Sequence, residues 1–346
     1  MKKNLAIALI ALGLFSCKTN PVYLTVTEPA PVSIPGHIKK VGIINRSILS
    51  DENKILNTID QVLSEKGSEL DKEGAKESIR GVTDALLQNN RFSQVIFLDK
   101  VDFKSARAGV FSSPLSWDVI EKTCRENNLD ALFVLELFDT DSKISYSTTP
   151  VKVKTPLGDI PAIEHHAQMV TLVRTGWRIY DPKIKTILDE FPVSESLVFN
   201  GSGINPVVAA AALMNRKEAV KQTGYKGGQS YAYRILPYSI RVSREYYVKG
   251  NDNFKIAKRM ARVGNWNDAA ELWKKEITNP STKIMGRACY NMAIINEING
   301  DLDAAIDWAQ KAYVYSNKRL AMNYVNILKN RKSRNIRLQN QLEEAH

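Results

Sequence analysis

The feature that most constrains this fold is an internal repeat near the carboxyl end of the chain. Residues 264–273 (GNWNDAAELW) recur 36 residues later as residues 300–309 (GDLDAAIDWA). The glycine that begins each copy turns the chain, and the apolar residue two positions later fills the gap between helices. Alanines stand seven residues before and five residues after each glycine, at Ala257, Ala293, Ala269 and Ala305. Because small residues let two helices cross closely, the pattern predicts stacked helical hairpins.

The repeat length resembles that of tetratricopeptide repeats, which recur about every 34 residues. This resemblance implies an all-α domain over residues 250–346, in which a capping helix (residues 319–329) is followed by a basic tail. The concave face of such repeats normally receives a peptide or a helix from a partner. The residues expected to bind a protein partner occupy the first helix of each hairpin: Asn253, Lys258, Arg262, Asn291 and Asn296.

The amino terminus carries the pattern of an export signal. Two lysines are followed by an apolar run from Leu5 to Phe15 and then by the sequence LFSC, which ends at Cys17. Such a run is too short to span a bilayer of about 30 Å as a helix. LFSC resembles a bacterial lipobox, in which the cysteine is acylated and becomes the new amino terminus. The resemblance implies a signal peptide over residues 1–16, lipidation of Cys17 and attachment to the outer membrane.

The segment after the lipobox is rich in proline. Residues 17–36 contain four prolines and are expected to form an extended tether. An acidic run directly after the cysteine resembles a surface-export signal of Bacteroidota lipoproteins; here no acidic residue precedes Glu28, which favours the periplasmic face. The formal net charge of +11 suits anionic headgroups or acidic polymers, whereas nucleic acid is not an expected partner of an exported protein.

The region between tether and repeats alternates strand and helix patterns. Short apolar runs indicate buried strands and three- to four-residue spacing indicates amphipathic helices, in the order 39–45, 74–90, 94–99, 116–124 and 130–138. Residues 143–154 and 168–180 bracket a Pro/Gly-bearing segment, as in a long hairpin. The fold class predicted is α+β: a sandwich-like α/β domain over residues 37–249, with a mixed sheet and a long hairpin, followed by the all-α repeats.

Three segments carry a family resemblance. KKVGIINR (39–46), LLQNNRFSQVIFLD (86–99) and NNLDALFVLELFD (127–139) resemble the domain shared by curli-secretion lipoproteins and the amino-terminal part of TolB. In curli-secretion lipoproteins, comparable hairpins enter the outer membrane and close a pore. TGWRIYDP (175–182) and GGQSYAYRILPYSIRVSREYY (227–247) resemble a Bacteroidota lipoprotein family of unknown function, and this resemblance brings no assigned activity.

No motif in the sequence predicts a catalytic residue, a metal site or a cofactor. His165 and His166 are adjacent, so on a strand they would point to opposite faces, and a solvated loop is expected there. Gly201-Ser202-Gly203 lacks the lysine of a phosphate-binding loop and is expected to be a turn. Cys124 and Cys289 are expected to be buried thiols on helices.

The leading functional hypothesis is a non-enzymatic, lipid-anchored cell-envelope protein that binds a protein partner through its helical repeats. The alternative is a lipoprotein that binds an envelope polymer or a glycan through Tyr231, Tyr233, Arg234 and Tyr238, although the same residues could pack on a core. A pore-forming secretion lipoprotein or a hydrolase comes third. The oligomeric state stays open.

Overall fold

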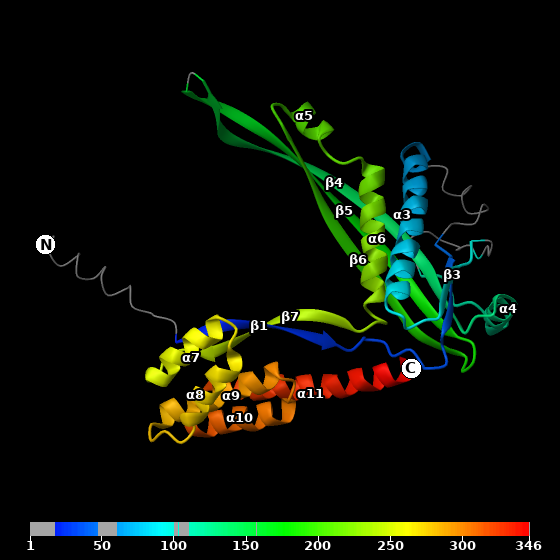
Figure 1. Cartoon of the computed structure of the whole chain (residues 1–346). Coiled ribbons are helices and arrows are strands. Elements are labelled where there is room, and N and C mark those ends of the chain that lie inside the picture. Colours follow the sequence, from blue (N-terminus) through cyan, green and yellow to red (C-terminus); the bar gives the residue numbers. More distant parts are fainter. Residues whose placement is uncertain (1–17, 48–60, 100–102, 104–110, 157, 346) are drawn as a thin grey trace. The chain divides into compact units, whose positions relative to one another are not determined.

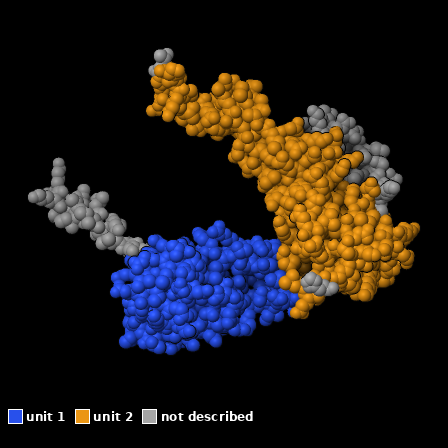
Figure 2. All heavy atoms as spheres, in the orientation of Figure 1, with its two compact units in different colours: residues 1–29, 238–340 blue, residues 30–237, 341–346 orange. Residues whose placement is uncertain are grey.

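The computed structural model describes residues 18–47, 61–99, 103, 111–156 and 158–345 (Figure 1). The segment predicted to be a signal peptide and the predicted lipidation site Cys17 therefore lie outside the described residues. The chain divides into two compact units, coloured separately in Figure 2. Unit 1 comprises residues 1–29 and 238–340, and unit 2 comprises residues 30–237 and 341–346. No helix within the described ranges is long and apolar enough to cross a membrane.

Unit 2 is built on one five-stranded sheet, in which β2 pairs in parallel with β3 and β4, and β4, β5 and β6 pair antiparallel. The sheet order is β3 (Gln94–Phe97), β2 (Lys40–Asn45), β4 (Ala131–Thr155), β5 (Gly158–Asp181) and β6 (Thr186–Gly203). This arrangement confirms the prediction of a mixed sheet in the amino-terminal part of the chain.

Helices cover both faces of this sheet. One face packs against α3 (Gln61–Gln88) and α6 (Arg216–Ala232), and the other packs against α4 (Trp117–Asn127). Along β4, Phe133 lies in the core between the sheet and helices α3 and α6. Leu132 and Val134 lie in the core on the opposite face of the sheet, together with Ile120 and Cys124 of α4. A strand that is buried on both faces explains why residues 131–135 form an unbroken apolar run.

Glycines on α3 and α6 let these two helices touch through their backbones. A Cβ atom at Gly228 would lie 1.9 Å from the carbonyl oxygen of Ser78, and one at Gly81 would lie 2.1 Å from that of Tyr225. Both distances are shorter than the 3.0 Å below which Cβ atoms essentially never approach another heavy atom. The neighbouring Gly227 differs, because the nearest atom to its Cβ position is 3.8 Å away.

Gly228→Ala is expected to destabilise the protein by about 3 kcal/mol, because the methyl group must push α3 and α6 apart. Gly227→Ala is the matched control and should be neutral or stabilising by up to about 1 kcal/mol, since alanine favours the helix and meets no clash. Urea unfolding of both variants provides the measurement. Equal destabilisation by the two would contradict the close backbone contact.

The long strands of unit 2 project from its body as an arm (Figures 1 and 2). We define the arm as residues 139–155 of β4, 158–175 of β5 and 194–203 of β6, together with the short helix α5 (Pro206–Ala211) that packs on it. The expected long hairpin is thus present, but β5 continues through Pro161. The turn is confined to residues 155–158, where Gly158 has a φ of +118°.

Unit 1 combines a two-stranded antiparallel ribbon with five helices. The ribbon pairs β1 (Thr19–Glu28) with β7 (Tyr238–Tyr247). The helices are α7 (Asp252–Arg262), α8 (Trp266–Lys275), α9 (Thr282–Ile298), α10 (Leu302–Ser316) and α11 (Arg319–Ala345). The expectation of a helical carboxyl-terminal region is confirmed. Gly264 and Gly300 turn the chain between successive helices with φ values of +82° and +86°.

The structure differs from the expected tether over residues 17–36. Half of that segment is strand β1, in which Val22 and Val26 are buried while Pro21 and Thr25 are exposed. Pro21 is tolerated because β1 pairs on one side, with β7. The domain boundary was expected between residues 249 and 250. In the structure, the helices share unit 1 with β7, and this part of unit 1 begins at Tyr238.

The last helix is longer than expected. Helix α11 runs to Ala345, so the predicted basic tail is helical, and the residues from Gln341 onward belong to unit 2. Two of its basic side chains in unit 1 bind acidic partners: Arg331 contacts Glu297 and Arg334 contacts Glu28 at 2.7 Å. Part of the positive charge of this segment is therefore neutralised within the fold.

Candidate functional site

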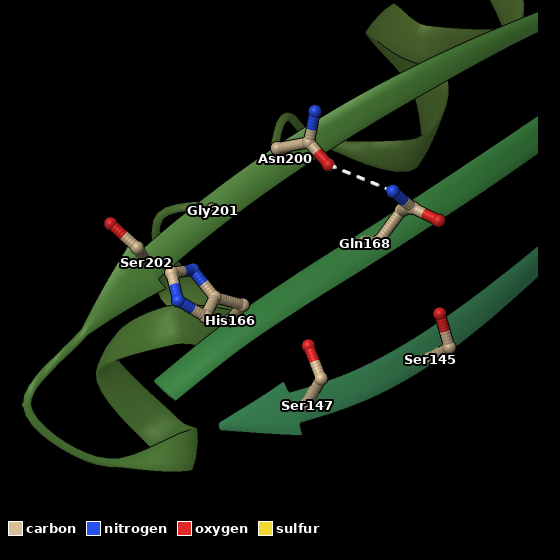
Figure 3. A pocket seen from close by; sticks show the side chains of 7 residues that line it. All are labelled: Ser145, Ser147, His166, Gln168, Asn200, Gly201 and Ser202. Atoms are coloured by element: carbon tan, nitrogen blue, oxygen red, sulfur yellow. Dashed lines mark hydrogen bonds between the residues drawn. The ribbon is translucent and has the colours of Figure 1, made fainter. Parts of the chain in front are cut away.

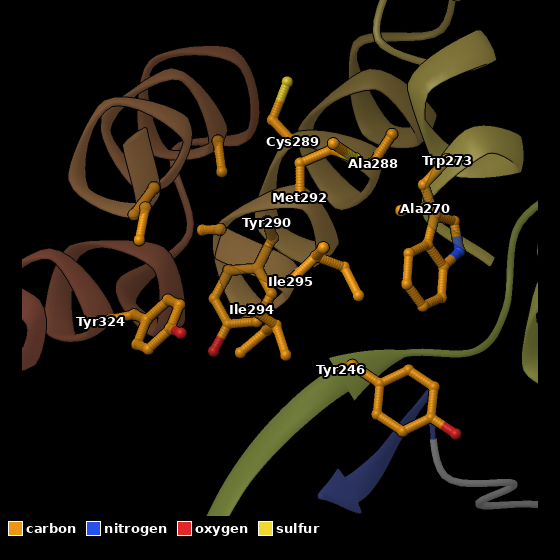
Figure 4. Packing of buried hydrophobic residues seen from close by; sticks show 14 of the residues in the cluster. Tyr246, Ala270, Trp273, Ala288, Cys289, Tyr290, Met292, Ile294, Ile295 and Tyr324 are labelled. Atoms are coloured by element: carbon orange, nitrogen blue, oxygen red, sulfur yellow. The ribbon is translucent and has the colours of Figure 1, made fainter. Parts of the chain in front are cut away.

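The face of the helical region expected to receive a partner is covered by the ribbon of unit 1. Helix α9 packs against β7 (Figure 4), and Asn291 of α9 is hydrogen-bonded to β7. Its side-chain oxygen accepts from the Tyr247 N–H at 2.7 Å, and its side-chain nitrogen donates to the Tyr247 carbonyl at 2.8 Å. Asn291 is fully buried, so this amide substitutes for a neighbouring strand.

Aromatic packing closes the same interface. The Tyr246 ring meets those of Trp266 and Trp273 at 5.3 and 6.0 Å between centroids, and Tyr247 meets Tyr290 at 5.3 Å. Figure 4 shows Tyr246 on β7 directed toward Trp273 of α8 and the apolar residues of α9. Val22 of β1 belongs to the same core. The ribbon therefore packs on the helices as part of the core of unit 1.

A buried carboxylate reinforces the attachment. Glu297 of α9 is fully buried and accepts two hydrogen bonds from Arg244 of β7, each 2.8 Å long. Tyr324 and Arg331 of α11 each donate a further bond of 2.6 Å. Burial alone would raise the pKa of the Glu297 carboxyl, but these four hydrogen bonds outweigh it and hold the pKa below its ordinary value.

The remaining residues predicted to bind a partner do not form one exposed surface. Asn253 is half-buried and donates to Glu276, and Asn296 donates to the Met292 carbonyl within its own helix. Lys258 is half-buried, whereas Arg262 is exposed. The prediction that Asn291 binds a partner is wrong for this structure, because its amide is buried and both of its polar atoms are bound.

Asn291→Ala is expected to destabilise the protein by about 3 kcal/mol, because it leaves the N–H and C=O of Tyr247 without partners in a desolvated interface. Asn296→Ala, on the same helix, should cost less than about 1 kcal/mol, since it removes one bond to the backbone of its own helix. Thermal and urea unfolding of the pair test this. Similar costs for both variants would refute the bridging role of Asn291.

Glu297→Gln is expected to cost about 3 kcal/mol near neutral pH, because it leaves Arg244 and Arg331 without a counter-charge. The folded pKa of Glu297 is depressed, so its contribution is complete above the unfolded value of about 4.3 and is lost as pH falls through the folded pKa. The stability gap between wild type and variant should therefore close below about pH 4. Glu271→Gln, at an exposed position on α8, should show no comparable gap at any pH.

The four residues of the glycan hypothesis do not line one surface, and two of them, Tyr231 and Arg234, pack inside unit 2. Tyr231 is fully buried, its ring stacks on Trp177 at 5.1 Å, and burial raises the pKa of its hydroxyl well above the ordinary value. Arg234 makes a bidentate contact with Asp189 at 2.9 and 3.1 Å. Tyr233 is exposed, and Tyr238 lies on β7 in unit 1. Tyr231 and Arg234 thus follow the alternative given for these residues, in which they pack on a core.

The arm carries the exposed sites of unit 2. On its open face, β4, β5 and β6 form a hollow of about 450 Å³ (Figure 3). Uncharged polar side chains from all three strands line it: Ser145, Ser147, His166, Gln168, Asn200 and Ser202. Gln168 donates to Asn200 at 3.1 Å. We call this hollow the polar pocket. Its hydroxyl and amide groups can both donate and accept hydrogen bonds.

The opposite face of the arm exposes apolar side chains. Ile144 and Tyr146 of β4 are 52% and 59% exposed, and Ile163 of β5 is 61% exposed. The strand register places these three residues on one face, the face on which α5 packs. We call them the apolar face. Isolated exposed apolar residues are common, but several on one face indicate a contact surface.

The arm also has an unpaired strand edge. Strand β2 pairs with β4 as far as Leu135, and beyond that residue β4 has β5 as its one neighbour among the described strands. Backbone N–H and C=O groups along such an edge are able to pair with a further strand. The edge and the apolar face were not anticipated from the sequence, because the strand register decides which exposed side chains share a face and which strand lacks a neighbour.

Two local expectations need correction. His165 and His166 lie in the middle of β5 and not in a loop, and they point to opposite faces as a strand requires. Gly201 and Gly203 end strand β6 and do not form a turn; Cβ atoms at the two positions would lie 2.5 Å from atoms of Ala209 and Val208 in α5. Within the described ranges, no group of three or more metal-ligating side chains occurs.

The polar pocket brings one histidine beside two serines. His166 lies 3.6 Å from Glu164, and the register places Ser147 and Ser202 beside it. Among the described residues, no hydrogen bond joins either serine to the imidazole. Cys124 and Cys289 are buried, and burial raises their thiol pKa values to about 12 and about 11, which makes both unreactive.

Two protein families match this sequence. Residues 38–247, more than half of the chain, match the family described as Domain of unknown function (DUF8603). Residues 255–330 match the family described as Domain of unknown function (DUF6340). No curated protein matches the chain.

Proposed function

The chain belongs to the family described as Domain of unknown function (DUF8603), and from its geometry we propose a lipid-anchored, non-enzymatic cell-envelope protein that binds a protein partner through its arm. The partner presents an extended segment that adds to the β4 edge and covers the apolar face. The observation that carries this proposal is the exposure of Ile144, Tyr146 and Ile163 on a β-arm whose β4 edge has no neighbour among the described strands.

Strand addition supplies both affinity and selectivity in this proposal. Backbone hydrogen bonds along the β4 edge hold the added segment, and alternate side chains of that segment reach the apolar face. The helical hairpins, which we propose to be tetratricopeptide-like from their 36-residue repeat, then have a different role from the expected one. They clamp the ribbon of unit 1 and leave partner binding to unit 2.

The lipid anchor rests on the lipobox resemblance of LFSC and on the apolar run before it. An outer-membrane location facing the periplasm is part of the same proposal, because no acidic run follows Cys17. Cys17→Ala should abolish labelling by a radioactive fatty acid and release the protein from the membrane fraction.

An envelope polymer or glycan is the second candidate ligand, and the polar pocket favours it. Six uncharged polar side chains on three strands match the hydroxyl and amide groups of a saccharide chain. A volume of about 450 Å³ accommodates a short stretch of such a polymer.

One pair of variants separates the two candidates. A photoreactive residue at Thr148, on the exposed part of β4, captures a protein neighbour in whole cells. Ile144→Lys with Tyr146→Lys should reduce capture at least about tenfold if the partner covers the apolar face. Ser145→Lys with Ser147→Lys, on the opposite face of the same strand, should leave capture unchanged.

The reverse pattern supports the polymer. In that case Ser145→Lys with Ser147→Lys abolishes co-sedimentation with envelope polysaccharide, and the apolar-face variant does not affect it. If both variants keep both the capture of a protein neighbour and the co-sedimentation with polysaccharide, both assignments are refuted.

A further inference from the structure

We propose that the end of unit 1 around Lys18, Lys249 and Arg287 is a membrane-contact surface that binds anionic lipid headgroups. This inference rests on the proposed lipidation of Cys17 and adds to it the surface that the anchor presses against the bilayer. We call these three residues the basic end.

The fold begins directly after the proposed anchor. The Lys18 carbonyl accepts a hydrogen bond from the Val248 N–H at 3.0 Å, and Thr19 is paired with Tyr247. One residue of extended chain spans at most about 3.6 Å, so a single peptide unit separates Cys17 from the ribbon. The length of the chain therefore leaves no slack between the acyl chains and unit 1.

The thickness of the bilayer fixes where the basic end must lie. The headgroup layer on each side of the hydrocarbon is about 5–8 Å thick. An acylated Cys17 lies within that layer, and Lys18 is one residue away. Lys249 follows Val248, the residue that is bonded to Lys18, and so lies within one Debye length, about 8 Å, of the same headgroups.

The charges at this end suit an anionic surface. Lys18 and Lys249 are exposed, and Arg287 of α9 donates to the Lys249 carbonyl at 2.6 Å while its guanidinium lies 5.3 Å from the centre of the Tyr247 ring. The acidic groups nearby are Glu245, which accepts from Thr19, and Asp252, which is paired with Lys255. The pairing of Asp252 with Lys255 leaves Glu245 against the three basic residues of this end, so positive charge prevails there.

The first experiment measures depth in the acylated full-length protein on vesicles of phosphatidylglycerol and phosphatidylethanolamine. A fluorophore is attached at Lys249→Cys or, as a control, at Lys329→Cys. Cys124 and Cys289 are buried and do not compete for the label. Lys329 is a suitable control because it lies far from the basic end. It stands two residues before Arg331, which is paired with Glu297. Glu297 is ten residues, and so about 15 Å, along α9 from Arg287. A headgroup-linked quencher should quench the label at 249 strongly and the label at 329 weakly.

The second experiment changes the charge and keeps the fold. In the same full-length chain with Cys17→Ala, binding to phosphatidylglycerol vesicles should fall about tenfold or more in Lys18→Glu with Lys249→Glu. Arg241→Glu with Lys329→Glu is the matched control, because it makes the same change in net charge at exposed positions and should bind almost as well as the parent. Thermal unfolding of each variant verifies that the fold is intact.

The outcomes separate the inference from the proposed function. If Cys17 is not acylated, the lipid-anchor proposal fails. If Cys17 is acylated but the labels at 249 and 329 are quenched equally, or both charge pairs weaken binding equally, the anchor stands and the membrane-contact surface is refuted. Binding that is as strong to phosphatidylcholine vesicles as to phosphatidylglycerol vesicles refutes the anionic specificity.

Discussion

The contact between the β1–β7 ribbon and helix α9 is the interaction on which unit 1 depends. A two-stranded ribbon is barely stable by itself in water. Here Asn291 bonds to both backbone groups of Tyr247, and Glu297 binds Arg244 while it also holds α11. The helices gain a cover for an apolar face that two hairpins alone would leave open. Ribbon and helices therefore stabilise each other, and the hollow that resembles a binding groove is part of the core.

Local patterns in the sequence predicted the elements well. Each correct prediction came from residues close together in the sequence. The apolar run at 131–135 indicated a strand, the spacing of Ile79, Val82 and Leu86 indicated a helix, and the glycines at 264 and 300 indicated turns. Such patterns depend on periodicity and turn geometry, which the chain carries locally. The mixed sheet and the helical carboxyl-terminal region followed from them.

Long-range pairing could not be predicted in the same way. Thr19 pairs with Tyr247 across most of the chain. The alternation of Val22, Leu24 and Val26 is typical of a strand, but it does not identify a partner strand more than two hundred residues away, and the prolines of the segment favoured a tether. The burial of Asn291 was missed for the same reason, because an asparagine on a helix looks solvent-exposed until a strand edge is placed against it. The polar pocket was missed as well, since its six residues come from three strands whose register decides which side chains meet.

Unit 1 is assembled from two segments, residues 1–29 and 238–340, and most of unit 2 occupies the sequence between them. During synthesis the amino-terminal strand emerges more than two hundred residues before the strand that pairs with it. Closing so long a loop is slow, whereas the contacts inside unit 2 are available earlier. Unit 2 is thus able to mature while the amino-terminal strand waits, and unit 1 is completed when β7 and the helices after it reach that strand.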